Sequence, residues 1–264
     1  MTTSFLDRYL DLHSPIHRLD ARVKFVLTLG LIVAVGLLPV GAWGPLALCA
    51  ALVWAAALRA QISLGLLLSR ALVALPFALV ALTLLFSRPG APLFQLPLGF
   101  TTLTATDAGL IAFVTVVLKS WVSVQAALLL TMTTHFTDML QALKDLRLPA
   151  VLVAILSFAY RYLFVLIDEG QRMMRARECR SAEAAGRRSG GSIRWQATVV
   201  GRMVGTLFLR SYERSERIYV AMLSRGYDGS LHAIQAKPLS ATEQGTLIIG
   251  LAICAAIVLL SYIL

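Results

Sequence analysis

Arginine is the residue type best placed to do chemistry in this sequence, and it gathers in one stretch. Between Asp168 and Lys237 the chain has thirteen Lys and Arg residues against seven Asp and Glu residues, an excess of six in a chain whose net charge is +10. A guanidinium group donates paired hydrogen bonds that suit a carboxylate. The chemistry that we expect of this stretch is therefore the recognition of an acidic partner.

Two short peptides within the basic stretch are similar to each other. Residues 174–178 read Met-Arg-Ala-Arg-Glu, and residues 221–227 read Ala-Met-Leu-Ser-Arg-Gly-Tyr. Gly226 suits the left-handed position that ends a helix, so Arg225 should be the last side chain of a helix and extend into solvent. A single arginine in a last turn is explained well enough by its favourable interaction with the helix dipole. Two such arginines on one membrane face favour a pair of docking ends.

Apolar residues at steps of three and four predict a helix before each peptide. The expected stripes are Phe164, Ile167, Gln171 and Met174 before the first peptide, and Phe208, Tyr212, Ser215, Tyr219 and Met222 before the second. Glu213 precedes Arg217 by four residues, which is a favourable helical pair.

The other candidate sites carry less weight. His13 and His17 are four residues apart, but Ser14-Pro15 between them favours a turn and no third ligand is near, so we expect no metal site. Asp7, Asp11 and Asp20 lack the paired arrangement that resembles membrane phosphotransferases. The sequence has no G-x-x-x-x-G-K-[ST] motif, which excludes ATP binding by that route. We expect no catalytic residue and no cofactor.

The composition is that of a membrane protein with several spans. Apolar residues make up 58% of the chain and charged residues 14%, against about 25% charged in an ordinary soluble domain. The basic excess lies between apolar runs, so it indicates a cytoplasmic loop rather than binding of nucleic acid. Cys49, Cys179 and Cys254 are far apart and suggest neither a disulfide framework nor a zinc site.

The hydropathy pattern predicts about five transmembrane helices with the N-terminus inside. The expected spans are residues 23–40, a second run that ends near 58, then 64–86, 108–131 and 245–264. Residues 87–107 should be an outside loop, with Asp107 capping the fourth span. Lys119 lies within that span and should face other helices or water. Lys119 and Gln125 could line a pathway, although polar residues that pack helices together are commoner.

A parity argument places the basic stretch inside. Residues 151–167 and 195–209 are short apolar runs interrupted by Arg161 and Arg202, and we expect them to be re-entrant or to lie at the membrane surface. The alternative is that both cross. The predicted fold class is an all-α membrane protein with cytoplasmic amphipathic helices. Its expected parts are a cytoplasmic lead-in (1–22), a four-helix membrane part (23–131), cytoplasmic or interfacial coupling helices (132–240) and a last span (245–264).

The two arginine peptides and the N-terminal lead-in resemble those of a known family. The two small-Arg motifs, Ala176-Arg177-Glu178 and Ser224-Arg225-Gly226, resemble the coupling signature of the T subunit of energy-coupling-factor transporters, of the ABC type. The lead-in Ser14-Pro15-Ile16-His17-Arg18-Leu19-Asp20 is similar to that of the cobalt-type member. The first motif departs from the family pattern, because Glu178 stands where the family usually has glycine.

The resemblance implies a non-catalytic subunit of an uptake system in the cell inner membrane. Each motif would dock on one of two cytoplasmic ATPase subunits, with Arg180, Met222 and Tyr227 in support. A substrate-binding membrane subunit is the other implied partner, and a small accessory membrane subunit is a further candidate. Cobalt is the expected substrate, linked to cobalamin biosynthesis; nickel or a vitamin is the alternative. The more distant alternatives for the function are a polytopic membrane enzyme and a stand-alone secondary transporter.

Overall fold

The structure is a computed structural model of the 264-residue chain. It describes residues 9–10, 12, 14–87, 89, 91–97, 102–180, 192–228 and 239–263. The chain divides into two compact units: residues 1–146 with 236–264, and residues 147–235. Asp7, Asp11, His13 and the glycine-rich segment 186–191 lie outside the described residues.

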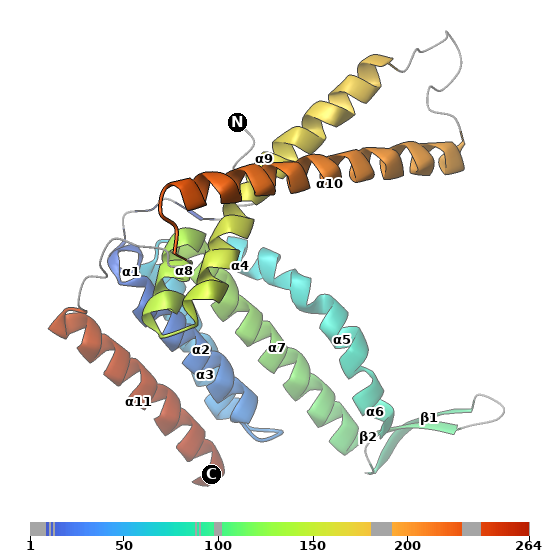
Figure 1. Cartoon of the computed structure of the whole chain (residues 1–264). Coiled ribbons are helices and arrows are strands. Elements are labelled where there is room, and N and C mark those ends of the chain that lie inside the picture. The colour runs from blue at the N-terminus through green and yellow to red at the C-terminus, as the bar shows by residue number, and fades with distance from the viewer. Residues whose placement is uncertain are drawn as a thin grey trace. The chain divides into compact units, whose positions relative to one another are not determined.

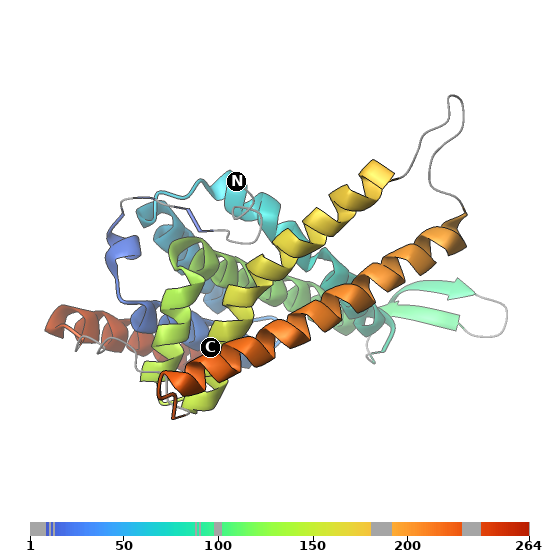
Figure 2. The ribbon, with the colours of Figure 1, turned by 45° about the horizontal axis from the view of Figure 1, so that its top comes forward.

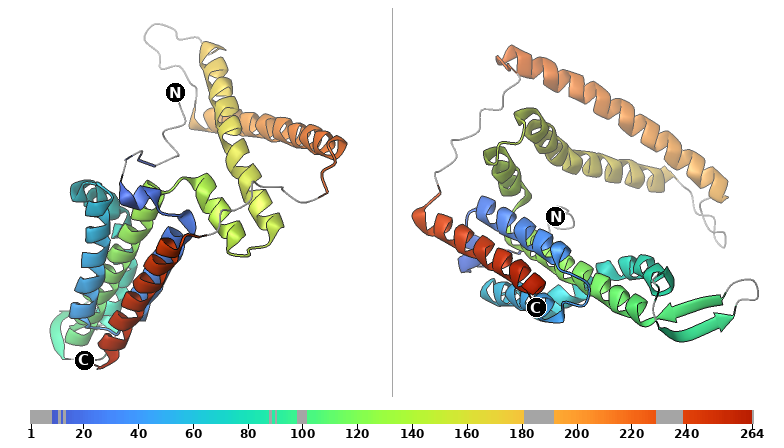
Figure 3. Two further views of the ribbon diagram at one scale, coloured as in Figure 1. Left: turned by 90° about the vertical axis from the view of Figure 1, so that its left-hand side faces the viewer. Right: turned by 90° about the horizontal axis from the view of Figure 1, so that it is seen from below.

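The first unit is a bundle of apolar helices. It contains α1 (Pro15–Arg18), α2 (Ala21–Leu37), α3 (Trp43–Arg59), α4 (Leu64–Ala71), η2 (Leu72–Ala74), α5 (Leu75–Ala81), α6 (Thr83–Ser87), α7 (Asp107–Thr133), α8 (Phe136–Asp145) and α11 (Ala241–Ile263). Figure 1 shows α2, α3, α7 and α11 side by side, and Figure 3 shows the same grouping from two other directions. Their shared core includes Val35, Cys49, Val122 and Ile257.

Two glycines allow α11 to pack closely on α2. A Cβ atom at Gly30 would lie 2.8 Å from Leu251 Cδ2, and one at Gly250 would overlap the side chain of Leu27. Each glycine therefore receives a leucine of the opposite helix. Small residues at such positions bring membrane helices together where lipid provides no hydrophobic driving force for their association.

The third predicted span, residues 64–86, is not one straight helix. It is divided into Leu64–Ala74 and Pro76–Phe86, which are bent by 46° relative to each other. Pro76 lies at the break, where its ring and missing N–H interrupt the hydrogen-bond ladder of a helix. Together the two pieces still have the length and composition of the predicted span, and the bend is what the sequence analysis did not indicate.

The segment after the third run contains a β-hairpin where we expected an irregular loop. Strands β1 (Pro92–Pro97) and β2 (Thr102–Thr106) pair in an antiparallel manner. The helix α7 that follows is capped by Thr106 and not by Asp107, because Thr106 Oγ1 accepts a hydrogen bond from Gly109 N at 3.1 Å. Asp107 is instead the first residue of α7, where a negative charge suits the helix dipole.

Polar side chains inside the bundle serve packing. Lys119 Nζ donates to the carbonyl oxygens of Gly36 and Leu38 at the end of α2, which confirms that this lysine faces another helix. Gln125 is 1% exposed, and its Oε1 accepts a hydrogen bond from Trp54 Nε1 at 2.8 Å. The carbonyl groups at the end of α2 are satisfied further by Tyr262 Oη, which donates to Leu37 O at 3.0 Å.

The second unit consists of two long helices, α9 (Ala150–Arg180) and α10 (Ile193–Ser224). The two helices have opposite chain directions, and they cross in Figure 1 and in the left view of Figure 3. Figure 2 shows them spreading apart toward the end of α9 and the start of α10. Arg210 Nη1 of α10 and Glu169 Oε1 of α9 are 2.6 Å apart and join the two helices.

The all-α membrane class with additional amphipathic helices is confirmed. Among the described residues, α7, α9 and α11 have the length and composition to cross a membrane, and the bent pair of residues 64–86 would be a fourth span. Helix α3 is apolar but has 17 residues. Residues 151–167 belong to the 31-residue helix α9, which is long enough to cross a membrane. The prediction that this run is too short to cross is therefore wrong. Its position relative to the membrane stays a prediction.

Candidate functional site

The second arginine motif forms the end of α10. Gly226 has a φ of +81°, Tyr227 N donates to Met222 O at 3.0 Å, and Gly226 N donates to Leu223 O at 2.9 Å. These two bonds are those of a Schellman motif, in which a left-handed glycine satisfies the last carbonyl groups of a helix. The predicted helix stop is confirmed. Arg225 is the capping residue and is exposed.

Met222 and Tyr227 line an apolar groove between α9 and α10. The groove has a volume of about 400 Å³. Its walls also include Phe158, Tyr162 and Leu166 of α9, and Arg214 and Ile218 of α10. Contact between the residue after the left-handed glycine and the last turn of the helix commonly accompanies this type of helix end. The two residues predicted to support the second motif therefore lie where they can hold its shape.

The first arginine motif lies within α9 and not at a glycine stop. The helix continues through Ala176, Arg177 and Glu178 to Arg180. Glutamate is compatible with a helix interior, whereas glycine at this position would favour the end of a helix. The two motifs thus differ in backbone conformation although their sequences are similar.

A second, basic cavity lies between the two helices next to the first motif. It has a volume of about 720 Å³ and is lined by Ala176, Arg177 and Arg180 of α9 and by Trp195 and Arg210 of α10, among others. Glu169 is part of this cavity and contacts both Arg172, at 2.7 Å, and Arg210, at 2.6 Å. One carboxylate thus faces four arginines, and the cavity keeps a positive charge.

Glu169 and Arg210 line the candidate site, and sequence reasoning did not indicate either of them. They are 41 positions apart, and only the crossing of the helices brings them together. The predicted pair within α10 was found, since Arg217 Nη1 and Glu213 Oε2 are 3.9 Å apart.

The predicted stripes match the packed faces only in part. Ser215, Tyr219 and Met222 line the apolar groove, whereas Phe208 and Tyr212 line neither the groove nor the basic cavity. None of the four residues of the first stripe lines the groove or the basic cavity. The α9 residues that do so include Tyr162, Val165, Glu169, Arg172 and Ala176. The faces that meet are therefore rotated from those that the hydrophobic pattern indicated.

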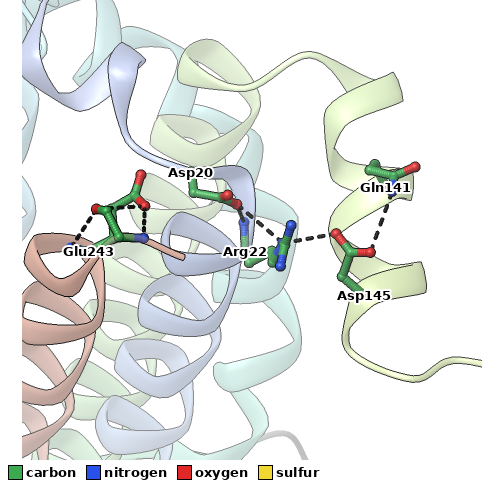
Figure 4. A network of polar contacts seen from close by, with 6 residues as sticks. Asp20, Arg22, Gln141, Asp145 and Glu243 are labelled. Atoms are coloured by element: carbon green, nitrogen blue, oxygen red, sulfur yellow. Dashed lines mark hydrogen bonds and ion pairs between the residues drawn. The ribbon is translucent and has the colours of Figure 1, made fainter. Parts of the chain in front are cut away.

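The first unit has a polar network of its own, shown in Figure 4. Arg22 Nε lies 2.8 Å from Asp145 Oδ2 and 3.6 Å from Asp20 Oδ1, so it joins the start of α2 to the end of α8. Asp20 also caps α2, because its Oδ1 accepts from Arg22 N at 2.9 Å. Glu243 bonds back to Ser240 N at 2.9 Å and forms a capping box at the start of α11.

The lead-in is held against the end of α7, because Leu10 N donates to Met132 O at 3.0 Å. Ser14 Oγ and His17 Nδ1 are 2.6 Å apart, and Ser14 caps the short helix α1. Lys24 Nζ, at the start of α2, donates to Thr133 O at 2.8 Å. The described residues contain no cluster of three His, Cys, Asp or Glu side chains that could hold a metal ion.

Apolar helices and a basic pair of crossed helices define this chain as a multi-pass membrane protein. Its sequence matches the family model described as "cobalt transport protein", CbiQ, over residues 13–235. The chain therefore belongs to the CbiQ cobalt transport family. The resemblance to the transmembrane T subunit of energy-coupling-factor transporters, of the cobalt type, is confirmed.

Similar proteins occur in archaea and bacteria. An uncharacterized protein of Methanocaldococcus jannaschii is 27% identical over 97% of this chain and 86% of its own length. The energy-coupling factor transporter transmembrane protein EcfT of Macrococcus caseolyticus is 26% identical over 85% of this chain and 84% of its own. A putative fused cobalt transport protein, CbiMQ, of Methanocorpusculum labreanum is 29% identical over 87% of this chain, and the match covers 38% of the fused protein.

Proposed function

We propose that this chain is the non-catalytic coupling subunit of an ATP-driven uptake transporter. The observation that carries the proposal is the pair of arginine motifs on two crossed helices, with Arg225 exposed at a helix end that a left-handed glycine closes and Arg177 beside a basic cavity. Membership of the cobalt transport family and the similarity to EcfT proteins support it. In this role the chain transmits conformational change and carries out no chemistry itself.

Each motif docks on one of two cytoplasmic ATPase subunits. Ala176, Arg177 and Glu178 form one docking end, and Ser224, Arg225 and Gly226 form the other. Arg180 supports the first end, and Met222 and Tyr227 support the second. Since both helices belong to one unit, a movement of either ATPase acts on the crossing point, where Glu169 and Arg210 form an ion pair.

A separate membrane subunit binds the substrate, and the exposed apolar face of α10 is a suitable surface for it. None of the residues of α10 is buried, and Val204, Phe208 and Tyr212 are each more than half exposed. Several exposed apolar side chains on one face of a helix are typical of an interaction site. Cobalt is the proposed substrate because of the family to which the chain belongs. A small accessory membrane subunit is a further candidate partner.

The proposed location is the cell inner membrane, with the N-terminus and the basic stretch in the cytoplasm. The charge rule for membrane proteins supports this orientation. The test is a single cysteine at position 190 in a background without Cys179. An impermeant thiol reagent should fail to label it in intact cells and should label it after permeabilisation. Ready labelling in intact cells would overturn the orientation.

Transport by the assembled system tests the function. The chain is expressed with candidate ATPase and substrate-binding subunits of the same type of transporter, and uptake of radioactive Co²⁺ is measured with and without the chain. Uptake should require the chain, and excess unlabelled Co²⁺ should suppress it more than excess Ni²⁺. The purified chain alone should not hydrolyse ATP. Uptake that persists without the chain would contradict the coupling role, and stronger suppression by Ni²⁺ would contradict the substrate alone.

A further inference from the structure

We propose that the apolar groove between α9 and α10 binds one anionic phospholipid of the membrane leaflet that faces the basic stretch. The groove is distinct from the basic cavity beside Arg177, since the two share no lining residue. It is lined by the apolar N-terminal half of α9 and by the C-terminal half of α10, which contributes one arginine, Arg214. An amphiphile with an apolar chain and a negative head group matches the apolar walls and this arginine.

The walls of the groove have the chemistry of an acyl-chain site. Phe158, Val165, Leu166 and Ile218 supply an apolar lining from both helices. Three tyrosines join them: Tyr162, Tyr219 and Tyr227. Tyrosine is enriched where membrane meets water, because its ring is apolar and its hydroxyl group is polar.

One basic side chain lies among the lining residues of the groove. Arg214 is the only ionisable cation among the lining residues, and no carboxylate lines the groove in the part of the chain that the structure describes. The hydroxyl groups of Ser211 and Ser215 already donate to Phe208 O and Tyr212 O within α10, so Arg214 supplies the contact to an anion. A phosphodiester head group can accept hydrogen bonds from the Arg214 guanidinium group while its acyl chain lies along the apolar wall.

The test uses the full-length chain in nanodiscs that contain phosphatidylcholine with a small fraction of phosphatidylglycerol. Either lipid carries a photoactivated diazirine in one acyl chain, and the cross-linked peptides are mapped by mass spectrometry. Phosphatidylglycerol should label residues 158–166 and 211–222 above the rest of the chain. Phosphatidylcholine should label them less, by about fivefold, since one basic residue at an anionic surface contributes about that factor.

Three variants separate the site from general lipid contact. Ile218→Trp fills the groove and should lower labelling by about fourfold for each methylene group that it displaces. Arg214→Gln should remove the preference for phosphatidylglycerol and keep the labelling by phosphatidylcholine. Arg217→Gln is the matched control, because Arg217 lies one turn away, pairs with Glu213 and does not line the groove. It should behave as the parent chain. Val165→Phe replaces Ile218→Trp if that variant does not fold.

Two results would overturn the proposal. One is equal labelling of all lipid-exposed helices by both lipids, unchanged in Ile218→Trp. The other is complete loss of the groove label when the ATPase and substrate-binding partners assemble with the chain, which would show that a protein partner occupies the groove. A label that persists in the assembled transporter supports a bound lipid.

Discussion

Gly226 provides a sensitive test of whether the shape of the α10 end matters for docking. Its φ is +81°, and a Cβ atom added there would meet no atom within 4 Å. The cost of Gly226→Ala is therefore one of backbone conformation alone, about 1–2 kcal/mol for a non-glycine residue in the left-handed region. The population of the native helix end should fall about 5- to 30-fold relative to other conformations, and the apparent ATPase affinity can fall by up to that factor.

The assay is titration of the purified ATPase pair against the chain in nanodiscs. Gly226→Asn should lose less affinity, because asparagine tolerates the left-handed region better than alanine does. Gly205→Ala is the matched control, since this glycine lies inside α10 and its Cβ would also meet nothing within 4 Å. Gly205→Ala should keep the parent affinity for the ATPases and should stabilise α10 by about 1 kcal/mol, because alanine has a higher helix propensity than glycine. If Gly226→Ala binds as tightly as Gly205→Ala, the Schellman end is not part of the docking surface.

Three further changes test other parts of the account. Glu178→Gly should leave assembly with the ATPases intact or tighten it in co-purification; collapse of assembly would show that Glu178 makes a partner contact. Gly250→Val should lower the melting temperature in detergent through overpacking against Leu27, by the equivalent of about 1–3 kcal/mol, whereas Gly245→Val, with open space around it, should not. Asp145→Ala leaves Arg22 without its nearer carboxylate and should cost about 1–3 kcal/mol by the same measurement, and an unchanged melting temperature would mean that the pair is only incidental.

Features set by neighbouring residues could be predicted from the sequence. The stop of α10 at Ser224-Arg225-Gly226 depends on a glycine next to the last turn, and the Glu213–Arg217 pair on a spacing of four. The composition indicated the membrane class. Pro76 and the alternating Thr102–Thr106 segment were visible signals of the bend and of the hairpin, but the overall hydropathy of residues 64–86 and the loop composition outweighed them.

Features set by distant parts of the chain could not be predicted. The face that α9 presents depends on where α10 crosses it, so the stripe through Phe164 and Met174 was misplaced. The Glu169–Arg210 pair arises from the same crossing. The sequence did not distinguish Thr106 from its neighbour Asp107 as the cap of α7, because the side chains of both residues can accept a hydrogen bond from the first turn of a helix.

The central claim is that Arg177 and Arg225 are two docking ends for the ATPases. Loss of one arginine that pairs with a buried carboxylate commonly costs 2–5 kcal/mol, roughly 30- to several-thousand-fold in affinity. Because the second contact is effectively intramolecular once the first has formed, one intact motif can partly mask the loss of the other. Arg225→Lys should also bind poorly, since an ammonium group cannot form a bidentate pair.

The most direct measurement is co-purification of the ATPases from detergent with the Arg177→Ala/Arg225→Ala double variant, together with Co²⁺ uptake in cells. Arg187→Ala/Arg188→Ala, which removes the same charge from the segment between α9 and α10, is the control. We predict that each single variant weakens retention of the ATPases and Co²⁺ uptake, that the double variant releases both ATPases, and that the control keeps them. A double variant that retains its ATPases and transports normally would contradict the account, and the two motifs would then be ordinary helix ends.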